Sequence, residues 1–192
     1  KTDKRDAQKI ARCLAHHDYS PVHVPTAQDE ETKEYIRMRD DHKLALKRLK
    51  QQILAFCLKH DFRYPGGSTY WTLNHLKWLR ELETSRLYRE ILDEYLLTYS
   101  NLDEKVERLD RRIEELAADE EYAESVHKLV CFLGIKAQTA LSVVTETGDF
   151  NRFSTAQQYA SYLGLVPGES SSGEDQIRLG ITKAGNRHLR TL

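Results

Sequence analysis

The sequence predicts a mainly α fold, in which a long helical hairpin or coiled coil is followed by a small helical domain with a helix-hairpin-helix-like unit and a short β segment. Only 9 Gly and 4 Pro occur among the 192 residues, so long stretches can run as uninterrupted helix. Two segments repeat apolar residues at alternating spacings of three and four, and a Pro-Gly-Gly-Ser run at 65–68 separates them. After residue 125, short apolar runs alternate with glycine turns, which indicates smaller packed helices.

The overall composition narrows the class of protein. Hydrophobic residues make up 40% and charged residues 31% of the chain, and the net charge is −1. No apolar run approaches the roughly 20 residues needed to cross a bilayer, and no secretory signal is recognisable at the start. The three cysteines lie far apart, which argues against a disulfide framework or a zinc cage. We therefore expect a cytoplasmic protein without a membrane segment, and the first residue, Lys1, indicates a fragment of a longer protein.

The first predicted helix spans about residues 3–17, since Ile10 and Leu14 recur at helical spacing. Asp3 and Asp6 lie three residues apart and share one face of this helix. Paired carboxylates of this kind can hold Mg²⁺ through their oxygens. Acidic residues in a first helical turn are more commonly caps or partners of the helix dipole, so the pattern alone favours that simpler interpretation.

Two long helices are predicted next, with a shorter apolar helix between them. The first spans about residues 29–60, and the second keeps its apolar spacing from 92 to 116. The two seams consist of Leu46, Leu49, Ile53 and Phe56, and of Leu92, Tyr95, Tyr99, Leu102, Val106, Leu109, Ile113 and Leu116. Such a pair forms either an antiparallel hairpin or an intermolecular coiled coil, so self-association through these helices is one of our expectations.

Residues 126–147 have the outline of a helix, a Gly-Ile-x turn and a second helix. Turns of this kind present backbone N–H groups to a phosphate, and Lys136 could contact a phosphate itself. Lys136 stands where a helix-hairpin-helix usually has its second glycine. A plain packing unit of two helices is an equally good interpretation. Ser154 is expected to cap the next helix, which would end near Gly164.

The C-terminal stretch is basic, because residues 176–192 contain no acidic residue. Its cations could neutralise a phosphate and position its oxygens, and they are Arg178, Lys183, Arg187 and Arg190. We interpret Gly168 and the serines at 170–172 as a flexible polar turn, and residues 176–181 as a short strand leading to a final helix. A serine in this place needs activation before it can act as a nucleophile. Composition alone therefore favours a flexible loop beside a solvated basic helix.

Two stretches closely resemble the serine-bearing domain of the DEDD-type insertion-sequence transposases. They are residues 162–173, Tyr-Leu-Gly-Leu-Val-Pro-Gly-Glu-Ser-Ser-Ser-Gly, and residues 180–190, which contain Gly-Ile-Thr-Lys-Ala-Gly-Asn and Leu-Arg. The opening segment 1–7 resembles the part of that family that carries the last two acids of an acidic tetrad. The resemblance implies three regions: a remnant of a ribonuclease-H-like acidic domain at 1–28, a coiled-coil region at 29–125 and the serine-bearing domain at 126–192.

The same resemblance implies a site and its partners. Ser172 would be the nucleophile that attacks DNA, with Ser171 as second choice, while Asp3 and Asp6 would bind Mg²⁺. Lys136 and the four cations of the C-terminal stretch would contact nucleic acid, and a structured guide RNA would direct the reaction. The other two tetrad acids lie upstream in the family, so we expect the chain alone to be inactive. The alternative function is a non-catalytic helical module for nucleic-acid binding and dimerisation.

Overall fold

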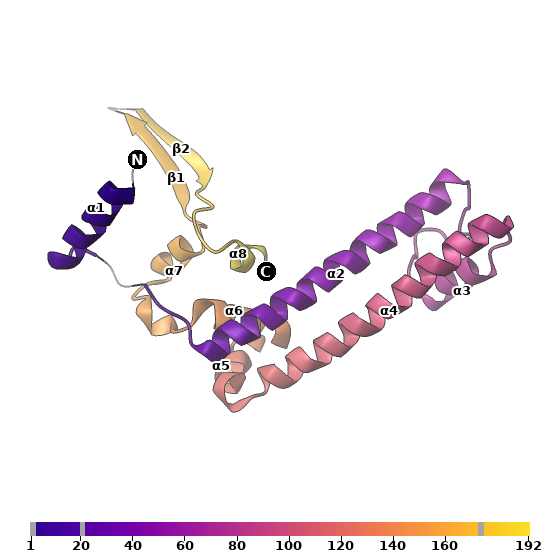
Figure 1. Ribbon diagram of the computed structural model, residues 1–192, viewed down its shortest axis with the longest axis horizontal. Helices are drawn as coiled ribbons and strands as arrows, with labels where there is room; N and C mark the ends of the chain where they lie inside the picture. The colour runs from indigo at the N-terminus through magenta and orange to yellow at the C-terminus, as the bar shows by residue number, and fades with distance from the viewer. Residues whose placement is uncertain (1–2, 20–21, 173–174) are drawn as a thin grey trace.

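The computed structural model describes residues 3–19, 22–172 and 175–192, and this part of the chain is mainly helical (Figure 1). At 169–172 and 175–178 it describes the backbone alone. The elements are α1 (Asp3–Ala15), α2 (Ala27–Lys59), α3 (Leu73–Glu81), α4 (Arg86–Ala117), α5 (Glu120–Val130), α6 (Ala137–Thr147), a 3-10 turn η1 (Phe150–Arg152), α7 (Ala156–Tyr162), β1 (Pro167–Ser172), β2 (Asp175–Ile181) and α8 (Arg187–Thr191). The predicted fold class is confirmed. Among the described helices, none has the length and apolar character of a membrane span.

Helices α2 and α4 run antiparallel and form the long hairpin seen in Figure 1, with α3 folded against its far end. Hydroxyl caps begin each helix: Thr26 Oγ1 accepts a hydrogen bond of 3.0 Å from the N–H of Asp29, and Ser85 Oγ accepts one of 3.5 Å from the N–H of Tyr88. The structure thus forms the antiparallel hairpin, the first of the two arrangements that the apolar seams allowed.

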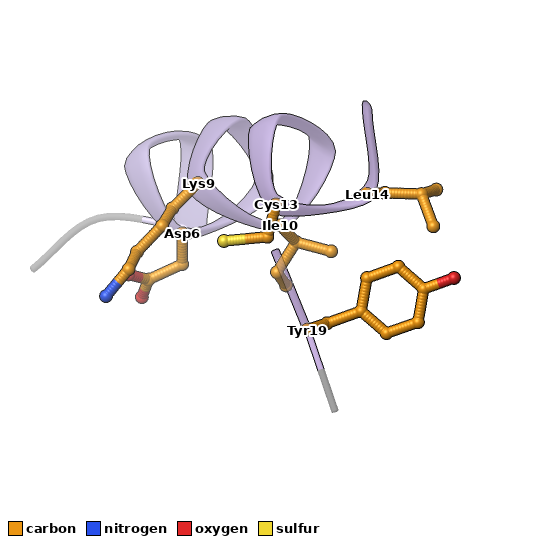
Figure 2. A pocket seen from close by; sticks show the side chains of 6 residues that line it. All are labelled: Asp6, Lys9, Ile10, Cys13, Leu14 and Tyr19. Atoms are coloured by element: carbon orange, nitrogen blue, oxygen red, sulfur yellow. The ribbon is translucent and has the colours of Figure 1, made fainter. Parts of the chain in front are cut away.

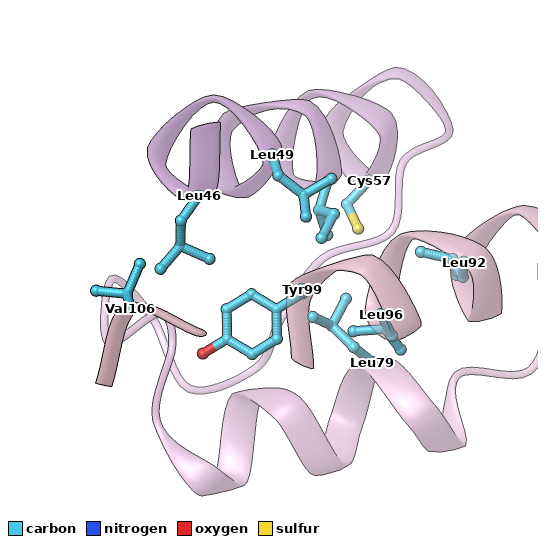
Figure 3. Packing of buried hydrophobic residues seen from close by; sticks show 9 residues of the cluster. Leu46, Leu49, Cys57, Leu79, Leu92, Leu96, Tyr99 and Val106 are labelled. Atoms are coloured by element: carbon cyan, nitrogen blue, oxygen red, sulfur yellow. The ribbon is translucent and has the colours of Figure 1, made fainter. Parts of the chain in front are cut away.

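A distal core fills the far half of this hairpin. Figure 3 shows its side chains converging from α2, α3 and α4. The buried members are Leu46, Leu49, Ile53, Cys57, Leu79, Leu92, Leu96, Tyr99 and Val106. Most of the predicted seam residues are therefore covered within one chain, which removes their apolar surface from water. A second copy of the chain would have to associate through another surface.

A proximal core joins the near end of the hairpin to the helices that follow. Its buried members are Ile36, Ile113, Ala117, Tyr122, Val126, Ala140, Leu141 and Val144, from α2, α4, α5 and α6. The Tyr122 hydroxyl donates a hydrogen bond of 3.1 Å to Asp29 Oδ1, so a carboxylate that is 8% exposed has a partner. Packing is thus continuous across the boundary expected near residue 125.

Strands β1 and β2 form a two-stranded antiparallel arm, which we call the β-arm (residues 167–181). Ser171 pairs with Gln176 and Ser172 with Asp175, and the pairing becomes irregular between Pro167 and Glu169. Our interpretation of the serine run as a flexible turn was wrong, because the backbone of these serines lies in β1 and pairs with β2. The predicted strand at 176–181 is confirmed as β2.

Helix α7 begins one residue later than expected. Its cap is Thr155, whose Oγ1 accepts a hydrogen bond of 3.3 Å from the N–H of Gln158. The Gln158 side chain reaches back and accepts a bond of 2.7 Å from the N–H of Ser154. These two bonds resemble a capping box, except that Gln158 bonds the residue before the cap, and they show that Thr155 and not Ser154 is the cap.

Candidate functional site

The base of the β-arm is held by close approach of two backbone segments, one before β1 and one after β2. The carbonyl of Gly164 accepts a hydrogen bond of 3.1 Å from the N–H of Lys183, and the carbonyl of Val166 accepts one of 2.9 Å from the N–H of Thr182. A Cβ added to Gly185 would collide with the carbonyl oxygen of Tyr162 and would lie 2.6 Å from the nitrogen of Gly164. These glycines of the sequence motif therefore allow two chain segments to meet at the base of the arm.

Beside this base lies Glu146, a carboxylate near the end of α6 whose side chain is only 6% exposed. Its Oε1 accepts a hydrogen bond of 2.9 Å from Nη2 of Arg37 on α2, and its Oε2 accepts one of 2.8 Å from Nδ2 of Asn186. The Asn186 Oδ1 caps α8 through the N–H of Leu189 at 3.1 Å. Burial lowers the pKa of Arg37, the hydrogen bonds to Glu146 and Glu34 raise it, and the net effect is a rise. The Arg37 guanidinium therefore remains charged.

The cations predicted to bind nucleic acid lie in different environments. Lys183 and Arg187 are exposed, on either side of the turn that follows β2, and Lys136 is exposed at the start of α6. Arg190 is half-buried, and its Nη1 donates hydrogen bonds of 3.0 Å to the carbonyl of Leu163 and 3.5 Å to that of Gly185. Arg190 thus helps to hold the base of the β-arm, while the first three are open to a ligand.

Three predicted residues lie on the β-arm itself. Figure 1 shows the two strands extending away from α7 and α8, and Ser171 and Ser172 lie at the end of β1 remote from the base. Arg178 lies on β2, where its backbone pairs with that of Glu169. The side chains of Ser171, Ser172 and Arg178 lie outside the described residues, so only their place in the arm is known.

The predicted metal ligands lie on α1, which has no buried residue. Asp6 lines an open hollow of about 500 Å³ on this helix, together with Lys9, Ile10, Cys13, Leu14 and Tyr19. In Figure 2, Asp6 and Lys9 form a polar end of the hollow, and Leu14 and Tyr19 form an apolar end. Within the described ranges, no hydrogen bond or ion pair joins Asp3 or Asp6 to the β-arm, and no three His, Cys, Asp or Glu side chains gather to hold a metal.

Sequence reasoning missed the Arg37, Glu146 and Asn186 cluster. A signal for Glu146 was available, because it is the first acidic residue after Glu124 and it follows the apolar residues of α6. An isolated acid in such a helix needs a partner if it is buried. Nothing local in the sequence indicates Arg37, because 109 positions separate it from Glu146.

Comparison with known proteins shows what the region around this site is similar to. Residues 127–192 match the family described as transposase IS116/IS110/IS902. The similarity to that transposase family is thus confined to the C-terminal region. It contains the β-arm, Glu146, Asn186 and every predicted cation, whereas Asp3, Asp6 and Arg37 lie outside it.

Similarity to individual transposases extends over the rest of the chain. The putative transposase y4qE of Sinorhizobium fredii is 38% identical over all 192 residues, which cover 46% of that protein. The transposase for insertion sequence element IS1533 of Leptospira borgpetersenii is 34% identical over 78% of this chain and 44% of its own length. The transposase for IS1111A of Coxiella burnetii is 27% identical over the whole chain and 52% of its own length. The chain thus spans about half the length of these relatives.

Proposed function

We propose that this chain is part of a DNA transposase that cuts and rejoins DNA at an insertion-sequence element, with Ser172 as the nucleophile. The match of residues 127–192 to the transposase family carries the proposal. The β-arm supports it, because the serine run lies on a narrow two-stranded extension whose base is fixed to the helices.

The proposed reaction is an exchange of phosphoesters. The serine oxygen attacks phosphorus, a serine–phosphate bond forms, and the P–O bond to the leaving DNA strand breaks. The hydroxyl proton passes to a base or to water, and the leaving oxygen takes up a proton. Rejoining reverses these steps with the hydroxyl of a second strand as nucleophile. Lys183 and Arg187 are exposed at the base of the arm, whereas Ser172 lies at its far end, so they are suited to bind other phosphates of the same DNA and not the one that Ser172 attacks.

We also propose, from the family resemblance alone, that Asp3 and Asp6 bind Mg²⁺. Mg²⁺ prefers six oxygen ligands and commonly combines one or two carboxylates with phosphates and water. Two exposed carboxylates on one helix are an incomplete set of donors, and the described residues add no third.

The decisive test replaces single serines in the full-length protein. Ser172→Ala should abolish excision and the covalent link between protein and ³²P-labelled DNA, which is detected on a denaturing gel. Ser170→Ala, two positions away on the same strand, is the matched control and should retain both. Loss of the link in Ser171→Ala, with Ser172→Ala active, would shift the nucleophile by one residue. Normal excision by both Ser172→Ala and Ser171→Ala would refute the assignment of the nucleophile to either serine.

A non-catalytic nucleic-acid-binding module is the second candidate, and the exposed cations favour it. We propose that Lys136, Lys183 and Arg187 contact phosphates of DNA or of a structured guide RNA. Each lost contact should reduce the slope of log affinity against log salt by about 0.9 on duplex DNA. Binding of the triple Gln variant to a DNA duplex and to a folded RNA would be compared with that of the parent protein. An affinity that does not depend on salt would rule out this interface.

A further inference from the structure

The buried carboxylate of Glu146 lies where three parts of the molecule meet. Arg37 belongs to the helical hairpin, Glu146 ends the helix that packs on the proximal core, and Asn186 follows the β-arm. Each of the two carboxylate oxygens has a donor from a different part, at 2.9 Å and 2.8 Å. Burying a carboxylate without a partner costs free energy, so the fold is most stable when both donors stay bonded to Glu146.

Further bonds around Glu146 tie the same base together. The Tyr162 hydroxyl donates a hydrogen bond of 2.9 Å to the Glu146 carbonyl, which fixes the end of α7. The Arg152 guanidinium lies 4.6 Å from the centre of the Tyr162 ring and donates a bond of 3.1 Å to the Thr147 carbonyl. The backbone on both sides of the β-arm is therefore attached to the last turn of α6.

We propose that Glu146 is a positioning residue, which sets the orientation of the β-arm relative to the helical hairpin. This inference deepens the proposed function, because the β-arm carries the proposed nucleophile. Glu146 itself takes no part in bond making. It lies at the base of the arm, Ser172 lies at the remote end of β1, and both Glu146 oxygens are already occupied.

The chemistry of the side chain explains why glutamate suits this place. A carboxylate offers two equivalent oxygens, so it can accept from a guanidinium on one side and an amide on the other. Glutamine has the same size but offers one oxygen, and its NH₂ group would face a second donor. Aspartate keeps the charge but is shorter by one methylene, so it cannot reach both Arg37 and Asn186 from the same backbone position.

The test measures arm orientation in the full-length protein without DNA, by pulsed spin-label distances between probes at Leu58 on α2 and Leu179 on β2. Both side chains are exposed, at 83% and 52%. Glu146→Gln should at least double the width of the distance distribution. Glu34→Gln is the matched control, since Glu34 binds the other side of Arg37 at 2.8 Å and is 68% exposed. Its distribution should equal that of the parent protein.

The rate of amide hydrogen exchange provides a second, independent test of the same proposal. The N–H groups of Thr182 and Lys183 close the base of the arm, and their exchange should be about tenfold faster in Glu146→Gln. If this variant fails to fold, Arg37→Gln and Asn186→Ser each remove one side of the link. Distance distributions that are unchanged in both Arg37→Gln and Asn186→Ser would overturn the proposal. A distribution that broadens as much in Glu34→Gln as in Glu146→Gln would also overturn it. Because no DNA is present, a failure here is separate from any result with Ser172→Ala.

Discussion

Replacing Gly185 by alanine tests whether the close approach at the base of the β-arm holds the arm in place. The added Cβ would lie 2.6 Å from the nitrogen of Gly164 and 2.6 Å from the carbonyl carbon of Leu163. Both are backbone atoms of a hydrogen-bonded turn, so no flexible side chain can move aside. The two segments must separate, which lengthens the bond from the Lys183 N–H to the Gly164 carbonyl.

The expected cost follows from that geometry. Overpacking by one methyl group typically costs roughly 1–3 kcal/mol, and the rigid neighbours place this variant near the upper value. A loss of about 3 kcal/mol in the local opening free energy corresponds to roughly 10²-fold faster amide exchange. Exchange of the Thr182 and Lys183 amides, followed by NMR or mass spectrometry, measures this change directly.

Gly180 supplies the matched control within the same arm. A Cβ at Gly180 would meet nothing within 4 Å, so Gly180→Ala should change the opening free energy by less than about 0.5 kcal/mol. Equal exchange rates in the two variants would show that the approach of Gly185 to Gly164 does not restrain the arm. Faster exchange in both would assign the effect to the loss of glycine itself.

Two further predictions concern buried side chains of the helical part, His75 on α3 and Tyr122 on α5. Burial lowers the pKa of His75, so the unfolded chain binds a proton that the folded chain does not, and the free energy of unfolding should fall as pH drops below about 6.5. The free energy of unfolding, measured by urea unfolding between pH 5.5 and 7.5, should depend more steeply on pH in the parent protein than in His75→Gln, by up to about 1.4 kcal/mol per pH unit. Identical slopes of free energy against pH in the two proteins would contradict this prediction. Tyr122→Phe should cost about 1–3 kcal/mol of unfolding free energy by leaving Asp29 without its donor, whereas the exposed Tyr70→Phe should cost little. Equal stability of these two variants would disprove a role for the Tyr122 hydroxyl, whose pKa burial and the nearby Asp29 raise to about 12.

The long helices were predictable because their signal is local and repeated. Leu92, Val106 and Ile113 recur on one face of a single helix, and the structure buries all three. The sequence also indicated a hairpin through the Pro-Gly break, but the choice between one chain and two depended on whether α2 packs against α4 of the same chain. That packing joins residues far apart in the sequence, for which periodicity gives no information.

The base of the β-arm was only partly predictable. The motif glycines and Asn186 were recognised through a family resemblance, but their physical roles depend on contacts across the arm. The serine run was misjudged because the local propensity of Ser and Gly favours a turn, whereas a strand forms only when β2 lies opposite. Glu146 was missed because its partners lie 109 and 40 positions away.

The hairpin has a mechanical consequence for the rest of the molecule. Helix α2 has 33 residues, and at 1.5 Å per residue it is about 50 Å long. Its near end is fixed in the proximal core and linked to the arm through Arg37, so it acts as a lever with its fulcrum at that core. A sideways displacement of about 5 Å at the far end corresponds to a rotation of roughly 6° at the near end. Force applied at α3 would thus reach the β-arm as a small change of angle.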